Sequence, residues 1–318
     1  MMMAFKNRVL SGSEINKAYL ALFAVYLAWG TTFGAMHIGL SDFPPFVFAC
    51  QRFLIAGVLM IGFCLLKGEA LPSAFAVKRN VITGTLMFAC SNAVAFWTLQ
   101  YFSTGFAGLM VALHPFWMVA LTAILPPRET VKPMALLGLM VGFMGLSILL
   151  LPELTRPQAY NPMLLPCVLI TLCTGLTWAL GSIYMRKNPV SSSVLMSVGL
   201  QNLSAGLILI PVNLLMGNNP LMATGVHGLA ALIYLVVVGS LIGMTCYQYM
   251  MEKLPVPISS TFAYVTPLIT ITVGWLILGE SVSPMMLLGG LIILAGVYIV
   301  QTVSHKKLQP QLQTLKSA

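Results

Sequence analysis

The side chains with the clearest chemical potential lie inside long apolar runs of the chain. Arg52 lies within the run 44–66, and His114 lies near the middle of the run 105–125, directly before Pro115. A guanidinium can bind a carboxylate through paired hydrogen bonds, and a histidine can bind a solute or carry a proton. The competing interpretations are that Arg52 caps helix carbonyls or snorkels outward, and that His114 is a packed, neutral side chain.

Other residues near the middle of such runs extend this set. Aromatic side chains can stack on a solute, although most serve packing, and an amide is costly in lipid and should face the interior. Proline removes a backbone hydrogen bond, so Pro115 and Pro267 predict kinks or hinges that expose carbonyls. The predicted substrate-binding residues are Arg52, His114, Trp29, Trp178, Asn92 and Tyr264.

No metal, cofactor or catalytic chemistry is predicted from the remaining residues. The six cysteines all lie in apolar runs, without a CxxC pair or a matching histidine cluster, and small apolar filler is the better interpretation. The net charge of +9 is scattered in ones to threes along the chain. It does not form the basic cluster that nucleic acid would need, so nucleic-acid binding is excluded.

The elements that position these residues are predicted to be membrane-spanning helices. The chain is 58% hydrophobic and 7% charged, whereas soluble proteins contain about 25% charged residues. A bilayer core of roughly 30 Å needs about 20 apolar residues in a helix. The predicted fold is therefore an all-α membrane protein with ten spans: 18–40, 44–66, 80–101, 105–125, 133–151, 163–185, 192–215, 228–251, 258–278 and 284–303.

Positive charges predict the orientation of these spans, because cytoplasmic loops are enriched in Lys and Arg. With both termini in the cytoplasm, only Arg156 falls outside, and Arg52 lies within a span. The other 14 of the 16 basic residues fall inside: Lys6, Arg8, Lys17, Lys67, Lys78, Arg79, Arg128, Lys132, Arg186, Lys187, Lys253, Lys306, Lys307 and Lys316. The sequence therefore predicts a multi-pass protein of the cell (inner) membrane with a cytoplasmic N- and C-terminus.

The two halves of the chain resemble each other at an offset of 151 residues. Glu129 then falls on Glu280, Pro133 on Pro284 and Gly145 on Gly296. Five spans in each copy would insert the copies in opposite orientations, as two inverted five-helix repeats. We expect a cytoplasmic N-terminal segment (1–17), two repeats (18–156 and 157–303) and a cytoplasmic disordered tail (304–318). The glycine rows near the end of each repeat predict helix-packing faces, either inside the bundle or in a homodimer.

Several short motifs resemble those of EamA-type members of the drug/metabolite transporter superfamily. Trp29-Gly30-Thr31-Thr32-Phe33 is similar to the start of their first span. Leu278-Gly279-Glu280 followed by Leu288-Gly289-Gly290 is similar to their ninth-to-tenth span junction. The first copy departs from this pattern, since Pro126-Pro127-Arg128-Glu129 replaces the usual Gly-Glu. The resemblance implies two five-helix bundles that move small metabolites, usually outward.

The predicted function is secondary transport by alternating access, with a small metabolite or an amino-acid-like or drug-like solute as substrate and export as the expected direction. All seven acidic residues map to loops or interfaces, which favours facilitated diffusion or exchange over carboxylate-based proton coupling. Proton coupling through His114 is the lesser option. The alternatives are a membrane-embedded enzyme and a non-transporting receptor or scaffold. Enzymes of that class usually place a catalytic acid in a long interfacial loop, and the predicted loops are short and almost free of acids.

Overall fold

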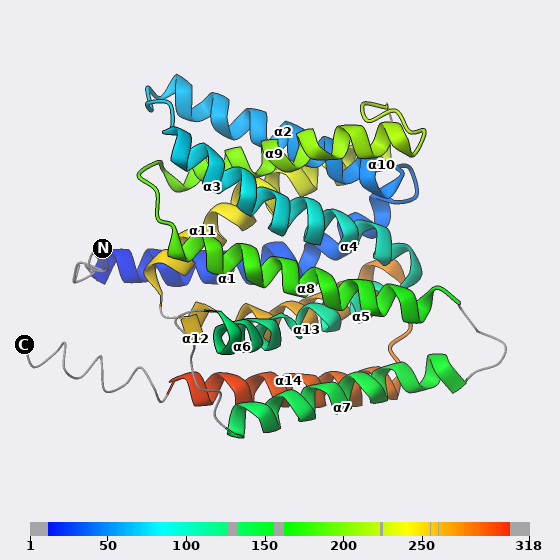
Figure 1. Cartoon of the computed structure of the whole chain (residues 1–318). Coiled ribbons are helices and arrows are strands. Elements are labelled where there is room, and N and C mark those ends of the chain that lie inside the picture. The colour runs from blue at the N-terminus through cyan, green and yellow to red at the C-terminus, as the bar shows by residue number, and fades with distance from the viewer. Residues whose placement is uncertain are drawn as a thin grey trace, which may run out of the picture.

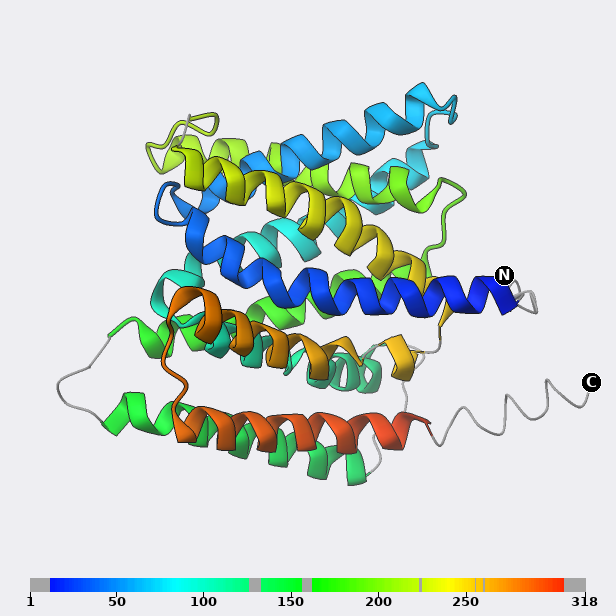
Figure 2. The same ribbon diagram turned by 180° about the vertical axis from the view of Figure 1, so that it is seen from behind.

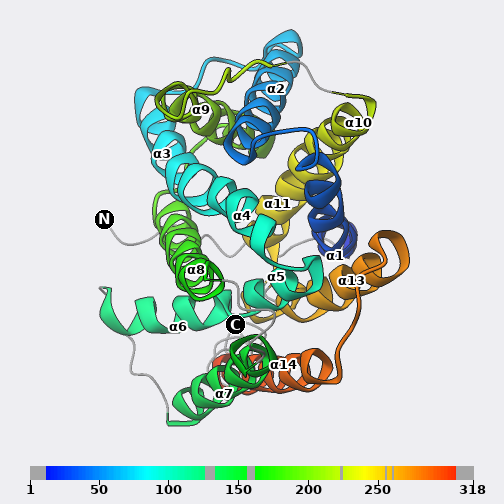
Figure 3. The same ribbon diagram turned by 90° about the vertical axis from the view of Figure 1, so that its right-hand side faces the viewer.

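The fold is given by a computed structural model that describes residues 12–125, 133–155, 162–222, 225–254, 256–259 and 261–305. Within these ranges every regular element is a helix, which confirms the all-α prediction. The helices run side by side across the molecule (Figures 1 and 2), and Figure 3 views the bundle from one end. We call the end where α1 begins and α14 ends the terminal side, and the opposite end the far side.

In the described ranges the helices form ten consecutive segments, and each overlaps one predicted span. Four segments are made of several helices joined end to end. The helices are α1 (Gly12–Gly39), α2 (Pro45–Leu66), α3–η1–α4–η2 (Ala74–Gly84, Thr85–Asn92, Ala93–Thr98, Leu99–Tyr101), α5–α6 (Thr104–Val111, His114–Ile124), α7 (Pro133–Thr155), α8 (Leu164–Lys187), α9 (Val194–Leu215), α10–η4–α11 (Val226–Tyr234, Leu235–Met244, Thr245–Lys253), α12–α13 (Val256–Ser259, Phe262–Leu278) and α14 (Pro284–His305).

Six of these segments are long and apolar enough to cross a membrane, judged by length and composition. They comprise α1, α2, the segment from α3 to η2, α8, α9 and the segment from α10 to α11. Shorter apolar helices cover Leu136–Leu149, Val265–Leu278 and Pro284–Ile299. That all ten segments cross the membrane, and that the two halves do so in opposite directions, stays a prediction at this point.

The ends of the chain differ in part from the predicted boundaries. Helix α1 begins at Gly12, so residues 12–17 are helical, although we predicted a separate N-terminal segment up to Lys17. Helix α14 continues to His305, so it includes the first two residues of the predicted tail; the division into segments and repeats stays a prediction. Residues 1–11 and 306–318 lie outside the described residues. Both differences follow from reading a helix end at the last apolar residue, although a helix continues past the apolar run wherever its backbone hydrogen bonds do.

Helices α7 and α14 lie against each other at the edge of the bundle (Figure 1). Their glycines allow this, because a Cβ atom at Gly145 would lie 2.7 Å from the backbone nitrogen of Ile293. A Cβ atom at Gly296 would likewise lie 2.6 Å from the backbone nitrogen of Gly142. The glycine rows therefore join two helices of one chain, as close backbone approach in membrane helices requires small residues.

Helices α2 and α9 form the second long contact, on the opposite edge of the bundle (Figure 3). On the terminal side, the Glu69 carboxylate accepts hydrogen bonds from the backbone nitrogen (2.9 Å) and hydroxyl (2.8 Å) of Ser193 at the start of α9. Burial alone raises the pKa of Glu69, but the hydrogen bonds from Ser193 outweigh this effect and place the pKa below its ordinary value.

On the far side, another carboxylate binds the start of a helix. The Asp42 carboxylate accepts a hydrogen bond of 2.8 Å from the backbone nitrogen of Gly228 in α10.

Two segments contain a wide, π-helical stretch near their middle. These are η1 (Thr85–Asn92) and η4 (Leu235–Met244), whose first residues are 150 positions apart (235 − 85). The spacing is within one residue of the 151-residue offset seen in the sequence. Wide turns of this kind are rare and are frequently found at functional sites. Both stretches contribute residues to the cavity described next.

Candidate functional site

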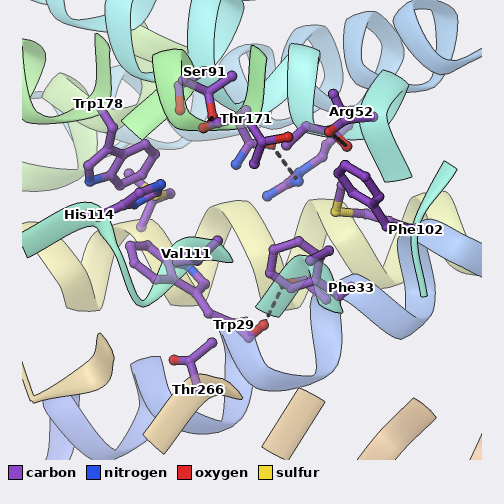
Figure 4. Close-up of a pocket in the computed structure, with 18 residues that line it drawn as sticks. Trp29, Phe33, Arg52, Ser91, Phe102, Val111, His114, Thr171, Trp178 and Thr266 are labelled. Carbon is purple, nitrogen blue, oxygen red and sulfur yellow. Dashed lines mark hydrogen bonds between the residues drawn. The ribbon is translucent and has the colours of Figure 1, made fainter. Parts of the chain in front are cut away.

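A cavity lies inside the bundle (Figure 4). Its lining extends from Trp29 and Trp178, near the middle of α1 and α8, to Met36 and Phe102, near the far-side ends of α1 and η2. Both halves of the chain line it, through helices α1, α2, α4, α5, α6, α8, α13 and the two π-helical stretches. The lining residues are Trp29, Thr32, Phe33, Met36, Arg52, Ser91, Asn92, Ala95, Thr98, Phe102, Ala107, Val111, His114, Thr171, Thr174, Trp178, Met244 and Thr266. A mainly apolar wall with a few inward polar groups is the usual character of a small-molecule site.

Arg52 reaches into this cavity from α2 and is 3% exposed. Its Nε atom donates to the Ser240 hydroxyl in η4 at 3.0 Å, and its Nη1 atom donates to the Asn92 side-chain oxygen in η1 at 3.3 Å. The guanidinium also lies over the rings of Phe53 and Phe96, at 5.4 and 5.8 Å from their centroids. Among the described residues it contacts, none is a carboxylate, so its positive charge is held only by neutral groups.

An aromatic cluster lies between the cavity and the terminal side. Trp29 contacts Trp178, Tyr247 and Phe262 at centroid distances of 5.6, 4.9 and 5.2 Å. The His114 ring stacks on Trp178 at 6.3 Å with 24° between the planes. Since Tyr247 and Phe262 are buried, this cluster forms a dense floor to the cavity.

Hydrogen bonds tie this floor to the helices around it. The hydroxyls of Tyr26 and Thr261 are 2.5 Å apart, which links α1 to the start of α13. The Ser182 and Tyr247 hydroxyls, 3.4 Å apart, link α8 to α11. The Tyr26–Thr261 contact joins the two halves of the chain, and the Ser182–Tyr247 contact braces the floor. Together they close the cavity towards the terminal side.

A buried polar network adds to the closure on the terminal side. Arg79 donates to the Asn80 side-chain oxygen at 2.6 Å and to the backbone oxygens of Met185 and Asn188 at 3.1 and 3.2 Å. Gln201 donates to the same Asn80 oxygen at 3.0 Å, and Gln248 donates to Gln201 at 2.6 Å. Such networks fix one arrangement of helices, because a buried polar group left without a partner is costly.

Thr266 is a lining residue whose buried hydroxyl has no partner among the described residues. Thr266 in α13 is 1% exposed, and its Oγ1 atom forms no hydrogen bond there. The hydroxyls of Thr32, Thr171 and Thr174 each donate to a carbonyl of their own helix, which leaves their oxygen lone pairs free to accept. The Thr266 Oγ1 atom is thus buried without a hydrogen bond, whereas the hydroxyls of these three threonines are paired.

A clamp on the far side joins the two halves next to the cavity. The Glu280 carboxylate, beyond the end of α13, accepts from the backbone nitrogen (2.7 Å) and hydroxyl (2.8 Å) of Thr104 at the start of α5. It also accepts from the backbone nitrogen of Gly105 at 3.3 Å. A negative charge at a helix N-terminus is stabilising, since the first backbone N–H groups have no partner within the helix. The clamp positions α5, which carries Ala107 and Val111 into the cavity wall.

The chain matches one known protein family over most of its length. The model of the EamA-like transporter family matches the chain twice, at residues 16–151 and 165–302. The chain belongs to the EamA-like transporter family. It carries two copies of the family's repeat, which between them supply the residues of the cavity.

Individual relatives of this EamA-like protein agree with that assignment. It is 27% identical to "Uncharacterized inner membrane transporter YedA" of Escherichia coli K12, over 83% of each chain. It is 26% identical to protein PecM of Dickeya dadantii, over 92% of this chain and 97% of that one. A "Probable amino-acid metabolite efflux pump" of Salmonella typhimurium is 23% identical, over 88% and 93% of the two chains. With its apolar helices, this EamA-like protein is a multi-pass membrane protein, and its relatives are named as transporters.

A solved crystal structure shares the fold of this EamA-like protein. Its TM-score is 0.65 at 19% sequence identity, and the match covers 92% of this chain and 98% of the other. At this identity the likeness concerns the arrangement of helices alone. It extends over both copies of the repeat, because so little of either chain is left out.

In this EamA-like protein, five of the six predicted binding residues line one cavity: Trp29, Arg52, Asn92, His114 and Trp178. The sixth, Tyr264, lies in α13, but its side chain is outside the described part of the structure. Binding by these residues stays a prediction. The cavity also contains residues that we did not predict, above all Thr32, Ser91 and Thr266.

The two predicted hinge prolines occupy different local structures. Pro115 lies in the first turn of α6, just after a break between α5 and α6 at residues 112 and 113. Pro267 lies inside α13, which continues through it without a break. A proline in the first turn of a helix removes no hydrogen bond, whereas one inside a helix does. A hinge role for either proline stays a prediction.

Proposed function

We propose that this EamA-like protein is a secondary transporter that moves a small metabolite, or an amino-acid-like or drug-like solute, across the inner membrane by alternating access. The observation that carries the proposal is the cavity itself. Residues of both repeats line it, and the aromatic floor around Trp29 and Trp178 closes it on the terminal side. A midplane site at the interface of two repeats is the arrangement that lets one site face each side in turn.

The proposal includes ten membrane spans in two inverted repeats, with the N- and C-terminus in the cytoplasm. Three observations support it. The 14-to-1 division of basic residues favours one orientation of every loop. Equivalent helices pair across the bundle, α2 with α9 and α7 with α14. The π-helical stretches η1 and η4 recur at the spacing of the repeat.

Export is the proposed direction, and the name of the Salmonella typhimurium relative as an efflux pump supports it. In the proposed orientation the cavity lies towards the outside, and the aromatic floor and the Arg79 network separate it from the cytoplasm. Release of a solute to the outside would need no further movement of that floor. Loading from the cytoplasm would require the contacts of Tyr247 and Phe262 with Trp29 to separate.

Counterflow into proteoliposomes tests the transport proposal. Vesicles containing the purified protein are loaded with an unlabelled solute, and uptake of the same labelled solute is measured for a panel of amino acids, organic acids and aromatic compounds. We expect saturable, protein-dependent counterflow for at least one class, because an alternating-access carrier exchanges solute faster than it returns empty.

A matched pair of tryptophan substitutions controls this experiment. Ala107→Trp places a large ring in the cavity wall, whereas Leu20→Trp places the same ring at a position of α1 that is 68% exposed on the outer surface. Ala107→Trp should abolish counterflow and Leu20→Trp should retain it. Absence of counterflow for the whole panel with folded protein, or equal rates in both variants, would overturn the proposal.

A further inference from the structure

We propose that the cavity selects organic carboxylates of net negative charge with a flat ring, in preference to zwitterions and neutral solutes of the same shape. The carboxylate would bind Arg52, and the ring would lie against the aromatic floor, at Trp29, Trp178 and His114. The inference rests on the proposed function, since it names the solute class for the transport cavity. Four observations on the described residues carry it.

The first observation is the unused hydrogen-bonding capacity of Arg52. A guanidinium has five N–H donors. The Nε donor is used by Ser240 and one Nη1 donor by Asn92, which leaves three (5 − 2) without a partner among the described residues. A carboxylate presents two oxygens at the spacing of a guanidinium edge and can accept two such bonds in parallel.

The second observation is that neutral contacts fix the guanidinium in place. The rings of Phe53 and Phe96 lie beside it, and a Cβ atom at Gly239 would come within 2.7 Å of its Nη2 atom. The charge therefore cannot move away from the cavity without losing these contacts. A buried charge without a counter-charge is costly, so an anionic ligand gains more from this site than a neutral one.

The third observation is the charge balance of the cavity wall. Arg52 and His114 are the ionisable side chains among the lining residues, and none of these residues is acidic. The ammonium of an amino acid would find only neutral acceptors there, while sharing the cavity with the guanidinium. A zwitterion would therefore lose part of what its carboxylate gains, whereas a simple carboxylate would not.

The fourth observation is the position of the aromatic floor relative to Arg52. Figure 4 shows Arg52 at one end of the cavity and Trp178 with His114 at the other. The Trp178 and His114 rings stack on each other, and Trp29 meets Trp178 edge-on. A flat ring extends such a stack favourably, since offset and edge-on ring contacts stabilise aromatic pairs beyond the burial of their surface.

A series of phenyl compounds with one ring and different charges tests the inference on the unmodified protein. The probes are 3-phenylpropionate (anion), 3-phenylpropionamide (neutral), phenylalanine (zwitterion) and phenethylamine (cation), measured by titration calorimetry at neutral pH. We expect 3-phenylpropionate to bind at least about 10-fold more tightly than each of the others, since hydrogen bonds between a guanidinium and a carboxylate are stronger than those between neutral groups. Failure of the anion to bind, or equal or tighter binding of phenylalanine, would overturn the inference.

Substitution of Arg52 tests the role of the guanidinium. Arg52→Gln should weaken binding of 3-phenylpropionate by about 10-fold or more and leave that of 3-phenylpropionamide within a factor of about three. Arg52→Lys should recover part of the affinity, because it restores the charge without the planar pair of donors. The matched control is Lys67→Gln, which removes a positive charge at the exposed end of the same helix, outside the cavity lining, and should change neither. An anion preference that survives Arg52→Gln would overturn the assignment to Arg52.

Two further measurements test the choice of a carboxylate and distinguish binding from transport. The compound 2-phenylethanesulfonate tests the carboxylate itself, and binding as tight as that of 3-phenylpropionate would overturn selection of a planar anion. Counterflow of labelled 3-phenylpropionate separates binding from transport. Tight, Arg52-dependent binding without counterflow would support the solute class and contradict the proposed function. Counterflow that is unchanged in Arg52→Gln would support the proposed function and contradict the solute class. If Arg52→Gln does not fold, the probe series on unmodified protein decides alone.

Discussion

Gly145→Ala and Gly296→Ala are each expected to destabilise the protein, although alanine is the better helix former. A Cβ atom at Gly145 would lie 2.7 and 2.8 Å from the backbone atoms Ile293 N and Gly289 O. At Gly296 it would lie 2.6 and 2.7 Å from Gly142 N and Gly138 O. Backbone atoms cannot rotate away, so α7 and α14 must separate. We expect each substitution to cost about 1–3 kcal/mol, the usual range for overpacking.

The measurement is the thermal unfolding midpoint of the purified protein in detergent. The matched control is Gly62→Ala in α2, where an added Cβ atom would meet nothing within 4 Å. That substitution should leave the midpoint unchanged or raise it, because Gly costs about 1 kcal/mol relative to Ala inside a helix. If the three alanine variants unfolded at the same temperature, the close contact of α7 with α14 would be contradicted.

Glu280→Gln is expected to weaken both stability and transport. The Glu280 carboxylate accepts three hydrogen bonds at the start of α5, two of them from the backbone nitrogens of Thr104 and Gly105. An amide keeps one acceptor oxygen but turns an N–H₂ donor towards donors, and it removes the favourable charge at the helix N-terminus. We expect a loss of about 1–3 kcal/mol in stability. The measurements are the thermal midpoint and the counterflow rate.

Glu69→Gln is the matched control for the clamp. Glu69 also accepts from the backbone nitrogen and hydroxyl of one residue, Ser193, but in an exposed loop remote from the cavity. We expect a smaller loss of stability and an unchanged counterflow rate, since water screens and replaces exposed interactions. Equal losses of counterflow in the two variants would show that Glu280 has no special role beside the cavity.

The sequence predicted those features that depend on composition and on single positions. Long apolar runs predicted the helical segments, and a lone arginine inside one of them predicted a functional position. Arg52, Asn92 and His114 were predicted because polar groups are expensive in lipid and must face the interior. Trp29 and Trp178 were predicted from their depth, and Trp29 also because its neighbour Gly30 permits close helix approach; the structure places both at the cavity.

Features that depend on a partner from elsewhere in the chain could not be predicted. Thr266 is an ordinary residue in the sequence, and its importance comes from lacking a partner where it is buried. The motif around Glu280 was noted as a resemblance, but the sequence did not reveal that its acceptor site is the start of α5. The network of Asn80, Gln201 and Gln248 likewise joins residues that are 121 and 47 positions apart.

The wide stretches η1 and η4 change how a sequence alteration would act on this cavity. An α-helix turns by about 100° per residue, so deleting one residue inside η1 would rotate everything after it on α4 by that angle. Ala95 and Thr98 would then leave the cavity wall, although neither had been altered. The number of residues in each π-helical stretch, as well as their types, thus determines which side chains line the cavity. A single-codon deletion in η1 or η4 would change the chemical identity of the wall more than a substitution in it.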